Sequence, residues 1–314
     1  MTAPALADAV TADGTAVRGT SSGGPAPSGR PGAGPRLRVV STALSILAAL
    51  LLGFVVDVAL VGDLRYARDR QVDYAGFRAE LANGVAPIGR SSGGGLAPGH
   101  GDPVALLDIP VLRLREVVRE GTTAEDLARG AGHRRDTTLP GQAGVSVIMG
   151  RQATYGGLFR RLEDLTAGDR FTVTTGQGKH TYRVIGPRRE GDPQPPALTG
   201  GRGRLTLITA DGTPFMPRGI LRVDADLVSD VQPAPAPAVL SGALPEEEKP
   251  MAVQQTAWLP LVLWGQGLVL AAAAVAWAHA RWGRRHTWVV GVPLLGALGL
   301  AVADQAALLL PNLL

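Results

Sequence analysis

The sequence predicts a mainly β soluble domain combined with three transmembrane α-helices. Three apolar runs, at about 39–62, 257–280 and 286–310, are each long enough to cross a bilayer, which takes about 20 residues. Between the first two runs, short segments are rich in β-branched residues or alternate apolar and polar residues, which is typical of strands. Few helical patterns interrupt these strands, and such an arrangement favours a closed barrel.

The composition excludes several kinds of chemistry. The chain has 314 residues, a formal charge of +4 and no cysteine, so disulfides, thiolate nucleophiles and cysteine-bound metals are excluded. Its five histidines are scattered without the spacing of metal ligands. We therefore expect neither a metal nor another cofactor.

Changes of composition along the chain predict its organisation. The start is rich in Gly, Pro, Ser and Ala, which favours disorder. The first apolar run exceeds the 7–15 residues, roughly, of a cleaved signal peptide, which favours a permanent anchor. We expect a disordered tail (1–37), a first span (38–62), a juxtamembrane helix and linker (63–103), a barrel domain (104–228), a Pro-rich linker (229–256), a second span (257–280), a loop (281–286) and a third span (287–310).

Within the barrel domain we predict individual strands and helices from local patterns. A capping-box-like start at Thr123–Asp126 predicts a short helix that ends near Gly130. Leu158, Phe159 and Leu162 recur at helical spacing and predict a second helix over 155–165. The predicted strands cover 104–110, 111–118, 145–149, 170–175, 180–185, 204–209 and 219–227.

Three motifs in this domain resemble those of one protein family. They are a glycine- and histidine-containing loop (130–141), a strand followed by a Tyr-Gly turn (144–162), and a strand that reads Leu-Thr-Leu-Ile-Thr (205–209). Together they resemble the sortases, the cysteine transpeptidases that attach proteins to bacterial cell walls, in particular the membrane-anchored, class E-like actinobacterial type. The resemblance covers roughly 103–228 and implies an eight-stranded barrel.

The departures from the family pattern concern its chemistry. Arg151 stands where the family has its catalytic histidine, and Ala210 stands where it has its cysteine. Arg218 is the better match to the family's catalytic arginine, and Arg222 is a less favoured register. The resemblance therefore implies a sortase-like fold with a degenerate catalytic site, in which no residue is assigned as catalytic.

Other nucleophiles find little support in the pattern. Strand alternation directs Thr209 away from the face of Ala210, and Ser146 lies inside a predicted strand. Arg151 stays protonated and cannot exchange a proton during catalysis. An active transpeptidase or hydrolase with a non-cysteine nucleophile remains the alternative hypothesis.

The resemblance also predicts a ligand-binding groove. Arg151 and Arg218 would face one pocket, with Tyr155 in the same motif and His133 on the rim. Two guanidinium groups favour a carboxylate or phosphate, so the expected ligand is a peptide or an anionic polymer of the cell envelope. In the alternative interpretation each arginine pairs with a local acid, such as Asp211 or Asp136.

The loop 281–286 sets the expected topology. It contains three arginines and no acid, which favours a cytoplasmic location. The barrel would then lie outside a bacterial plasma membrane and the amino terminus inside, in a multi-pass protein. This external location argues against a nucleic acid partner. The membrane is an expected partner.

Two acidic residues lie within the predicted spans. Asp57 and Asp304 are each about six residues from the outer end of their helix, and Gln266 and Gln305 lie at similar depth. Carboxylates in spans are costly and often functional. They could join the three spans or a membrane protein partner, or bind a proton or cation, or simply reach the outer interface.

These observations lead to one functional hypothesis with two alternatives. The chain is interpreted as a membrane-anchored, catalytically degenerate sortase homologue, a pseudoenzyme that binds its ligand at the cell surface beside the cell wall. The alternatives are the enzyme with another nucleophile and a membrane assembly factor in which the barrel is only a spacer.

The topology predicts opposite labelling of two introduced thiols. Cysteine at Ser91 should react with an impermeant thiol reagent on intact protoplasts, whereas cysteine at Gly283 should not. The native absence of cysteine removes background labelling. The reverse pattern would place the barrel inside the cell.

Overall fold

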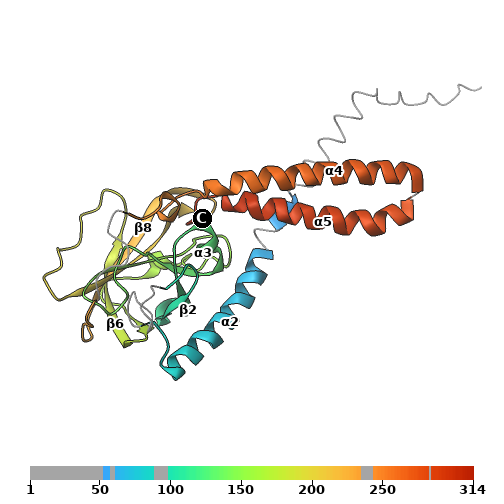
Figure 1. The fold of residues 1–314 in the computed structure, drawn as a ribbon. Helices are drawn as coiled ribbons and strands as arrows, with labels where there is room; N and C mark the ends of the chain where they lie inside the picture. Colours follow the sequence, from blue (N-terminus) through green and yellow to red (C-terminus); the bar gives the residue numbers. More distant parts are fainter. Residues whose placement is uncertain (1–51, 57–60, 88–97, 235–242, 283) are drawn as a thin grey trace, which may run out of the picture. The chain divides into compact units, whose positions relative to one another are not determined.

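The computed structural model describes the chain except for residues 1–51, 57–60, 88–97, 235–242 and 283 (Figure 1). In the described part, strands close into a barrel in the order β1-β2-β3-β4-β7-β8-β6-β5. The strands are β1 (Pro103–Ile109), β2 (Leu114–Glu120), β3 (Ala131–His133), β4 (Gly144–Met149), β5 (Arg170–Thr175), β6 (Gly178–Arg188), β7 (Gly203–Thr213) and β8 (Met216–Leu227). The mainly β prediction and the closed barrel are confirmed.

Strand pairing fixes which side chains face the barrel interior. β1 pairs with both β2 and β5, which closes the sheet, and β4 runs parallel to β7. Because side chains alternate across a strand, Leu205 and Leu207 join the barrel core while Ile208 and Ala210 face outward. The interior core also contains Phe171 and, from several strands and loops, Leu107, Ile148, Phe159, Leu162, Tyr182 and Val223.

Short helices connect and cover the strands. α3 (Ala124–Arg129) begins with the predicted capping box, in which the Thr123 hydroxyl accepts from the Asp126 N–H and the Asp126 carboxylate accepts from the Thr123 N–H. α2 (Gly62–Asn83) coincides with the predicted juxtamembrane helix and packs against β2 through Phe77 and Val117.

The predicted helix over 155–165 is wrong. This segment forms tight turns and a 3-10 turn at Leu162–Asp164. Tyr155, Gly156 and Gly157 have φ values of 51°, 83° and 52°, a left-handed conformation that cannot continue a right-handed helix. The apolar spacing that suggested a helix instead places Phe159, Leu162 and Leu165 in the barrel core.

Two further differences concern the first half of the barrel. Pro110–Leu112 forms a 3-10 turn and Arg113 is left-handed, so β2 begins later than the predicted 111. The sequence prediction missed β3, which pairs parallel to β2. A side chain at Gly132 would lie 2.2 Å from the Gly121 carbonyl, so this close pairing requires glycine.

Two helices near the end of the chain are long and apolar enough to cross a membrane. These are α4 (Trp258–Trp282) and α5 (Arg284–Leu308), and their apolar windows are only 6% and 11% buried. Helices so exposed are not the core of a soluble domain. Most of the expected span at 38–62 lies outside the described residues. Within this span, the described segment Leu52–Val56 is helical.

Polar residues of the predicted spans have different settings. Asp304 pairs with Arg65 of α2 and is half-buried. Gln266 is exposed on α4, Gln305 is half-buried, and Asp57 lies outside the described residues. In the part of the chain that is described, no hydrogen bond joins Gln266 to Asp304.

A buried carboxyl group links α2 to the barrel. Glu116 on β2 is 2% exposed, accepts a 2.8 Å hydrogen bond from the Tyr66 hydroxyl and lies 3.2 Å from Nε of Arg70. Burial raises the pKa of Glu116 to about 7, although the Tyr66 hydrogen bond and Arg70 act in the opposite direction. The folded protein therefore holds a proton there that the unfolded chain releases.

Glu116 should make stability fall with rising pH. Between about pH 4.5 and 7 the unfolded chain loses the proton first, so the folded state is progressively disfavoured, by on the order of 2–3 kcal/mol in total. Urea unfolding of Glu116→Gln should show a flatter pH profile in this window. The exposed control Glu125→Gln should keep the wild-type slope, and identical slopes for all three proteins would contradict the assignment.

Candidate functional site

An apolar surface on the outer face of the barrel forms the floor of the candidate site. Val147 and Met149 of β4, Ile208 and Ala210 of β7 and the half-buried Ile220 of β8 belong to one cluster outside the barrel core. The register places Ala210 opposite Ile220 and Met149 opposite Ile208. We call this surface, with Leu127 of α3 beside it, the groove.

The groove is covered by residues from distant parts of the chain. Leu313 is fully buried in the same cluster as Ala210, and Met251 packs against it. Figure 1 shows the end of the chain beside α3. Ala210, the residue matched to the family's cysteine, is therefore buried in a cluster with Leu313.

Arg151 follows β4 and is buried beside the groove, with 1% of its surface exposed. One terminal nitrogen donates to the Ala124 carbonyl at 2.8 Å, and the other donates to the Thr154 hydroxyl at 3.1 Å. Its guanidinium carbon lies 4.8 Å from the centre of the Tyr155 ring, a cation–π distance. No ion pair to Arg151 is present among the described residues, and its Nε has no hydrogen-bond partner.

This environment corrects the expected role of Arg151. Burial lowers the pKa of Arg151 to about 10, so the side chain remains charged at neutral pH. Its donors are directed to neutral groups of the protein, and it is not exposed to a ligand in solution. The two acids suggested as partners pair elsewhere, because Asp211 binds Arg189 at 3.0 Å and Asp136 binds Arg134 at 2.7 Å.

Tyr155 packs against the helical part of the protein. It clusters with Ala307 of α5, and Phe54 packs against them. The next residue, Gly156, donates its N–H to Asp63 of α2 at 2.7 Å. A side chain at Gly156 would lie 2.5 Å from the Tyr66 ring, so α2 can approach this turn only because the residue is glycine.

Arg218 and Arg151 do not form a common site. Arg218 is exposed near the start of β8, and the described residues give it no ion pair. Arg222, the less favoured register, lies two residues beyond Ile220 and lines a cavity of about 420 Å³ between β8 and the loop after β6. The sequence favoured Arg218 because it stands just before the last predicted strand, but β8 already begins at Met216, and its register against β7 shifts between Asp211 and Gly212.

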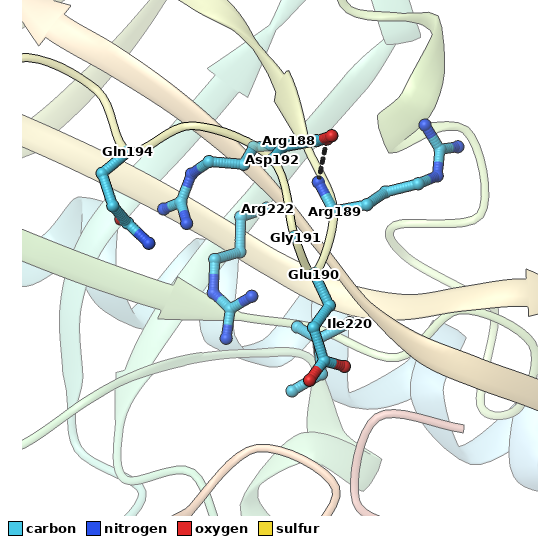
Figure 2. A pocket seen from close by; sticks show the side chains of 8 residues that line it. All are labelled: Arg188, Arg189, Glu190, Gly191, Asp192, Gln194, Ile220 and Arg222. Atoms are coloured by element: carbon cyan, nitrogen blue, oxygen red, sulfur yellow. Dashed lines mark hydrogen bonds between the residues drawn. The ribbon is translucent and has the colours of Figure 1, made fainter.

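The cavity at Arg222 is mixed in charge. Figure 2 shows Arg188 and Arg222 on neighbouring strands, with the Arg189 side chain pointing away from them. Burial and repulsion from Arg188 lower the pKa of Arg222. Arg188 pairs with Asp224 at 2.9 Å, and the acids Glu190 and Asp192 also line the cavity. Three arginines and two acids line the cavity, and two of the arginines pair with acids outside its lining, so the cavity has little preference for an anion.

His133 lies in the interior and not at the expected rim. Its imidazole is fully buried, with Nδ1 2.8 Å from Glu120 Oε2 and Nε2 3.0 Å from the Thr138 carbonyl oxygen. Both ring nitrogens are therefore engaged within the protein. A ligand in the groove cannot reach this side chain.

The alternative nucleophiles are equally enclosed. Ser146 and Thr209 are each 1% exposed, and by alternation they face the barrel interior with Ile148 and Leu207. The carboxylate of Asp211 is paired with Arg189. Within the described ranges, no group of three or more histidines and acids is placed to hold a metal.

The comparisons agree with the barrel and its motifs. Residues 107–218 match the family described as Sortase domain, so this part of the chain is a sortase domain. It is 33% identical over 88 residues to Sortase D of Bacillus subtilis (strain 168), an alignment that covers 28% of this chain and 43% of the relative. The chain thus spans less than half the length of that curated relative.

Similar solved structures are also sortases. The Sortase D5 transpeptidase of Clostridium perfringens is 21% identical with a TM-score of 0.41, over 52% of this chain and 99% of the other. Sortase E1 of Streptomyces coelicolor, solved with a tripeptide in the active site, is 26% identical with a TM-score of 0.37, over 41% and 90% of the chains.

The two arginines should respond differently to substitution. Arg151→Gln should lower the free energy of unfolding by about 2–4 kcal/mol, because it leaves the buried Ala124 carbonyl unpaired and loses the Tyr155 contact. The matched control Arg218→Gln, on an exposed side chain, should change it by less than about 0.5 kcal/mol. Denaturant titration measures both. If both substitutions changed the free energy of unfolding by less than about 0.5 kcal/mol, the buried Arg151 side chain would not be needed for stability.

Proposed function

We propose that this sortase domain is a non-catalytic binding module, anchored at the bacterial cell surface, whose groove holds an extended peptide. The observation that supports it best is the floor of the groove. Ala210 occupies the position matched to the family's cysteine, and the chain contains no cysteine. A sortase-like surface without its nucleophile retains shape and hydrogen-bonding edges but no means of acyl transfer.

The surrounding residues do not replace the missing chemistry. Acyl transfer needs a nucleophile and a group that exchanges a proton near neutral pH. Arg151 stays charged, since its pKa is about 10. The hydroxyls of Ser146 and Thr209 face the barrel interior, where no substrate can enter. Among the described residues, the two hydroxyls considered as alternative nucleophiles therefore do not support an enzyme with a non-cysteine nucleophile.

The properties of the groove favour a peptide over an anionic polymer. Its floor is apolar, and the cationic side chain expected to hold an anion is buried and bonded to neutral protein groups. In the cavity at Arg222, two of the three arginines already pair with acids, Arg188 with Asp224 and Arg189 with Asp211. Extended peptides bind through backbone hydrogen bonds and through pockets for alternate side chains.

The membrane anchors place this groove near a lipid surface. α4 and α5 are two apolar helices, and three arginines (281, 284 and 285) lie at the helix ends that follow each other in the chain. In the proposed topology these helix ends lie in the cytoplasm. The barrel, at the other end of the two helices, would then project from the outer leaflet. A peptide ligand would come from a protein of the cell surface or of the membrane itself.

The purified full chain should neither cleave nor transfer peptides. Turnover of fluorescence-quenched peptides in the presence of an amine acceptor should stay at background, because no nucleophile faces the groove. Ala210→Cys alone should also be inactive, since Arg151 and not a histidine stands nearby. Turnover that persists through further purification would refute the non-catalytic assignment.

A further inference from the structure

Residues 312–314 make a set of contacts that resembles a bound peptide. They follow α5 and are all buried, with 0%, 0% and 4% of their surfaces exposed. Three separate parts of the protein enclose them: the Thr122 loop before α3, the segment around Met251, and the turn 152–154 after β4.

The hydrogen bonds run along the backbone of this segment. The Asn312 N–H donates to the Ala252 carbonyl at 2.9 Å. The Leu313 carbonyl accepts from the Gln152 N–H at 2.9 Å. The Leu314 oxygen accepts from the Thr154 hydroxyl at 2.6 Å. Backbone recognition at successive residues is how grooves hold extended peptides irrespective of sequence.

Two side chains of the segment are recognised individually. The Asn312 amide nitrogen donates to the Thr122 carbonyl at 2.9 Å and to the Lys249 carbonyl at 3.0 Å. Two carbonyl acceptors select an amide over a carboxylate, which cannot donate. The Leu313 side chain packs in the apolar cluster that contains Ala210. These contacts specify an amide side chain followed by an aliphatic one.

We propose that the groove beside Ala210 is a peptide site that reads an Asn-Leu-Leu segment, and that residues 312–314 occupy it within the same chain. This inference rests on the proposed binding function and names the ligand class and its first occupant. A ligand from another protein then competes with this segment. The buried Arg151 supports the site indirectly, because it donates to the same Thr154 hydroxyl that binds Leu314.

A thiol at the floor of the groove reports whether the segment is in place. Ala210→Cys in the full chain, reconstituted in lipid nanodiscs, introduces the sole cysteine of this sequence. Its reaction with N-ethylmaleimide should be at least about tenfold slower than in the same variant lacking residues 312–314, because a covered thiol reacts only after local opening. Lys179→Cys, exposed on β6, should label equally with and without the segment.

A point substitution guards against misfolding of the shortened chain. Leu313→Asp keeps the chain length and places a carboxylate among Leu127, Met149 and Ile208, so it should also expose the thiol. Equal labelling of Ala210→Cys in the full chain, the shortened chain and the Leu313→Asp chain would overturn the proposal, provided that the Lys179→Cys control and far-ultraviolet circular dichroism show intact folds.

Added peptide tests the ligand class. A Leu-Pro-Asn-Leu-Leu peptide, capped at both ends, should restore protection to the shortened Ala210→Cys chain, and a version with Asp in place of Asn should require at least about tenfold more peptide. No protection by either peptide, or protection by inorganic polyphosphate alone, would overturn the proposal. Peptide turnover by the wild type would instead refute the non-catalytic function and leave these labelling results unaffected.

Discussion

The buried guanidinium of Arg151 holds together parts of the chain that lie far apart in the sequence. A charge removed from water must have partners, and here a carbonyl of α3, a hydroxyl of the following turn and an aromatic ring supply them in place of an acid. The left-handed backbone at Tyr155 brings the ring over the cation. With Thr154 fixed in this way, its hydroxyl faces Leu314. The covering of the groove therefore depends on a residue that touches neither Ala210 nor solvent.

The two apolar helices α4 and α5 connect the barrel to the segment that we propose as the occupant of the groove. α4 leaves the barrel and α5 returns to it, and the Gln254 N–H donates to the Leu308 carbonyl at 3.3 Å where the two meet. The link before α4 also packs on the domain, since Glu248 is buried 3.1 Å from Arg135 and its carbonyl accepts from Thr122. The linker expected at 229–256 is therefore packed against the barrel domain in its described second part, residues 243–256. A change in the packing of the two helices would consequently move the residues that fill the groove.

Local patterns predicted what depends on local physics. Alternation identified the β5–β6 hairpin and the strand with Ala210, and the capping box at Thr123 identified α3. The helix over 155–165 failed because two glycines and a tyrosine adopt left-handed angles that apolar spacing does not reveal.

The site was harder to predict than the fold. The sequence identified Arg151 and Ala210 as departures from the family, but their surroundings include residues that are distant in the sequence. The Ala124 carbonyl accepts from Arg151, and Leu313 belongs to the same cluster as Ala210. The contact between Thr154 and Leu314 joins residues 160 positions apart and has no local signal. Likewise, the burial of His133 follows from β3, a strand of only three residues. A strand so short leaves little pattern in the sequence, and the need for glycine at Gly132 becomes clear only from its close approach to the Gly121 carbonyl.

The alanine at position 210 connects the proposed loss of chemistry to the proposed occupant. It packs in the same cluster as Leu313, so a bulky side chain there would compete with Leu313 for space, whereas the single sulfur atom that cysteine adds is a small change, since protein interiors are close-packed. Burial of two leucine side chains contributes about 3–6 kcal/mol, and ordering the backbone of three residues costs about 3–6 kcal/mol. Because these terms nearly cancel, the hydrogen bonds of Asn312 and the flanking backbone decide whether the segment stays bound. A segment held by so small a margin can exchange with a peptide of the same pattern, whereas a segment of the barrel core could not.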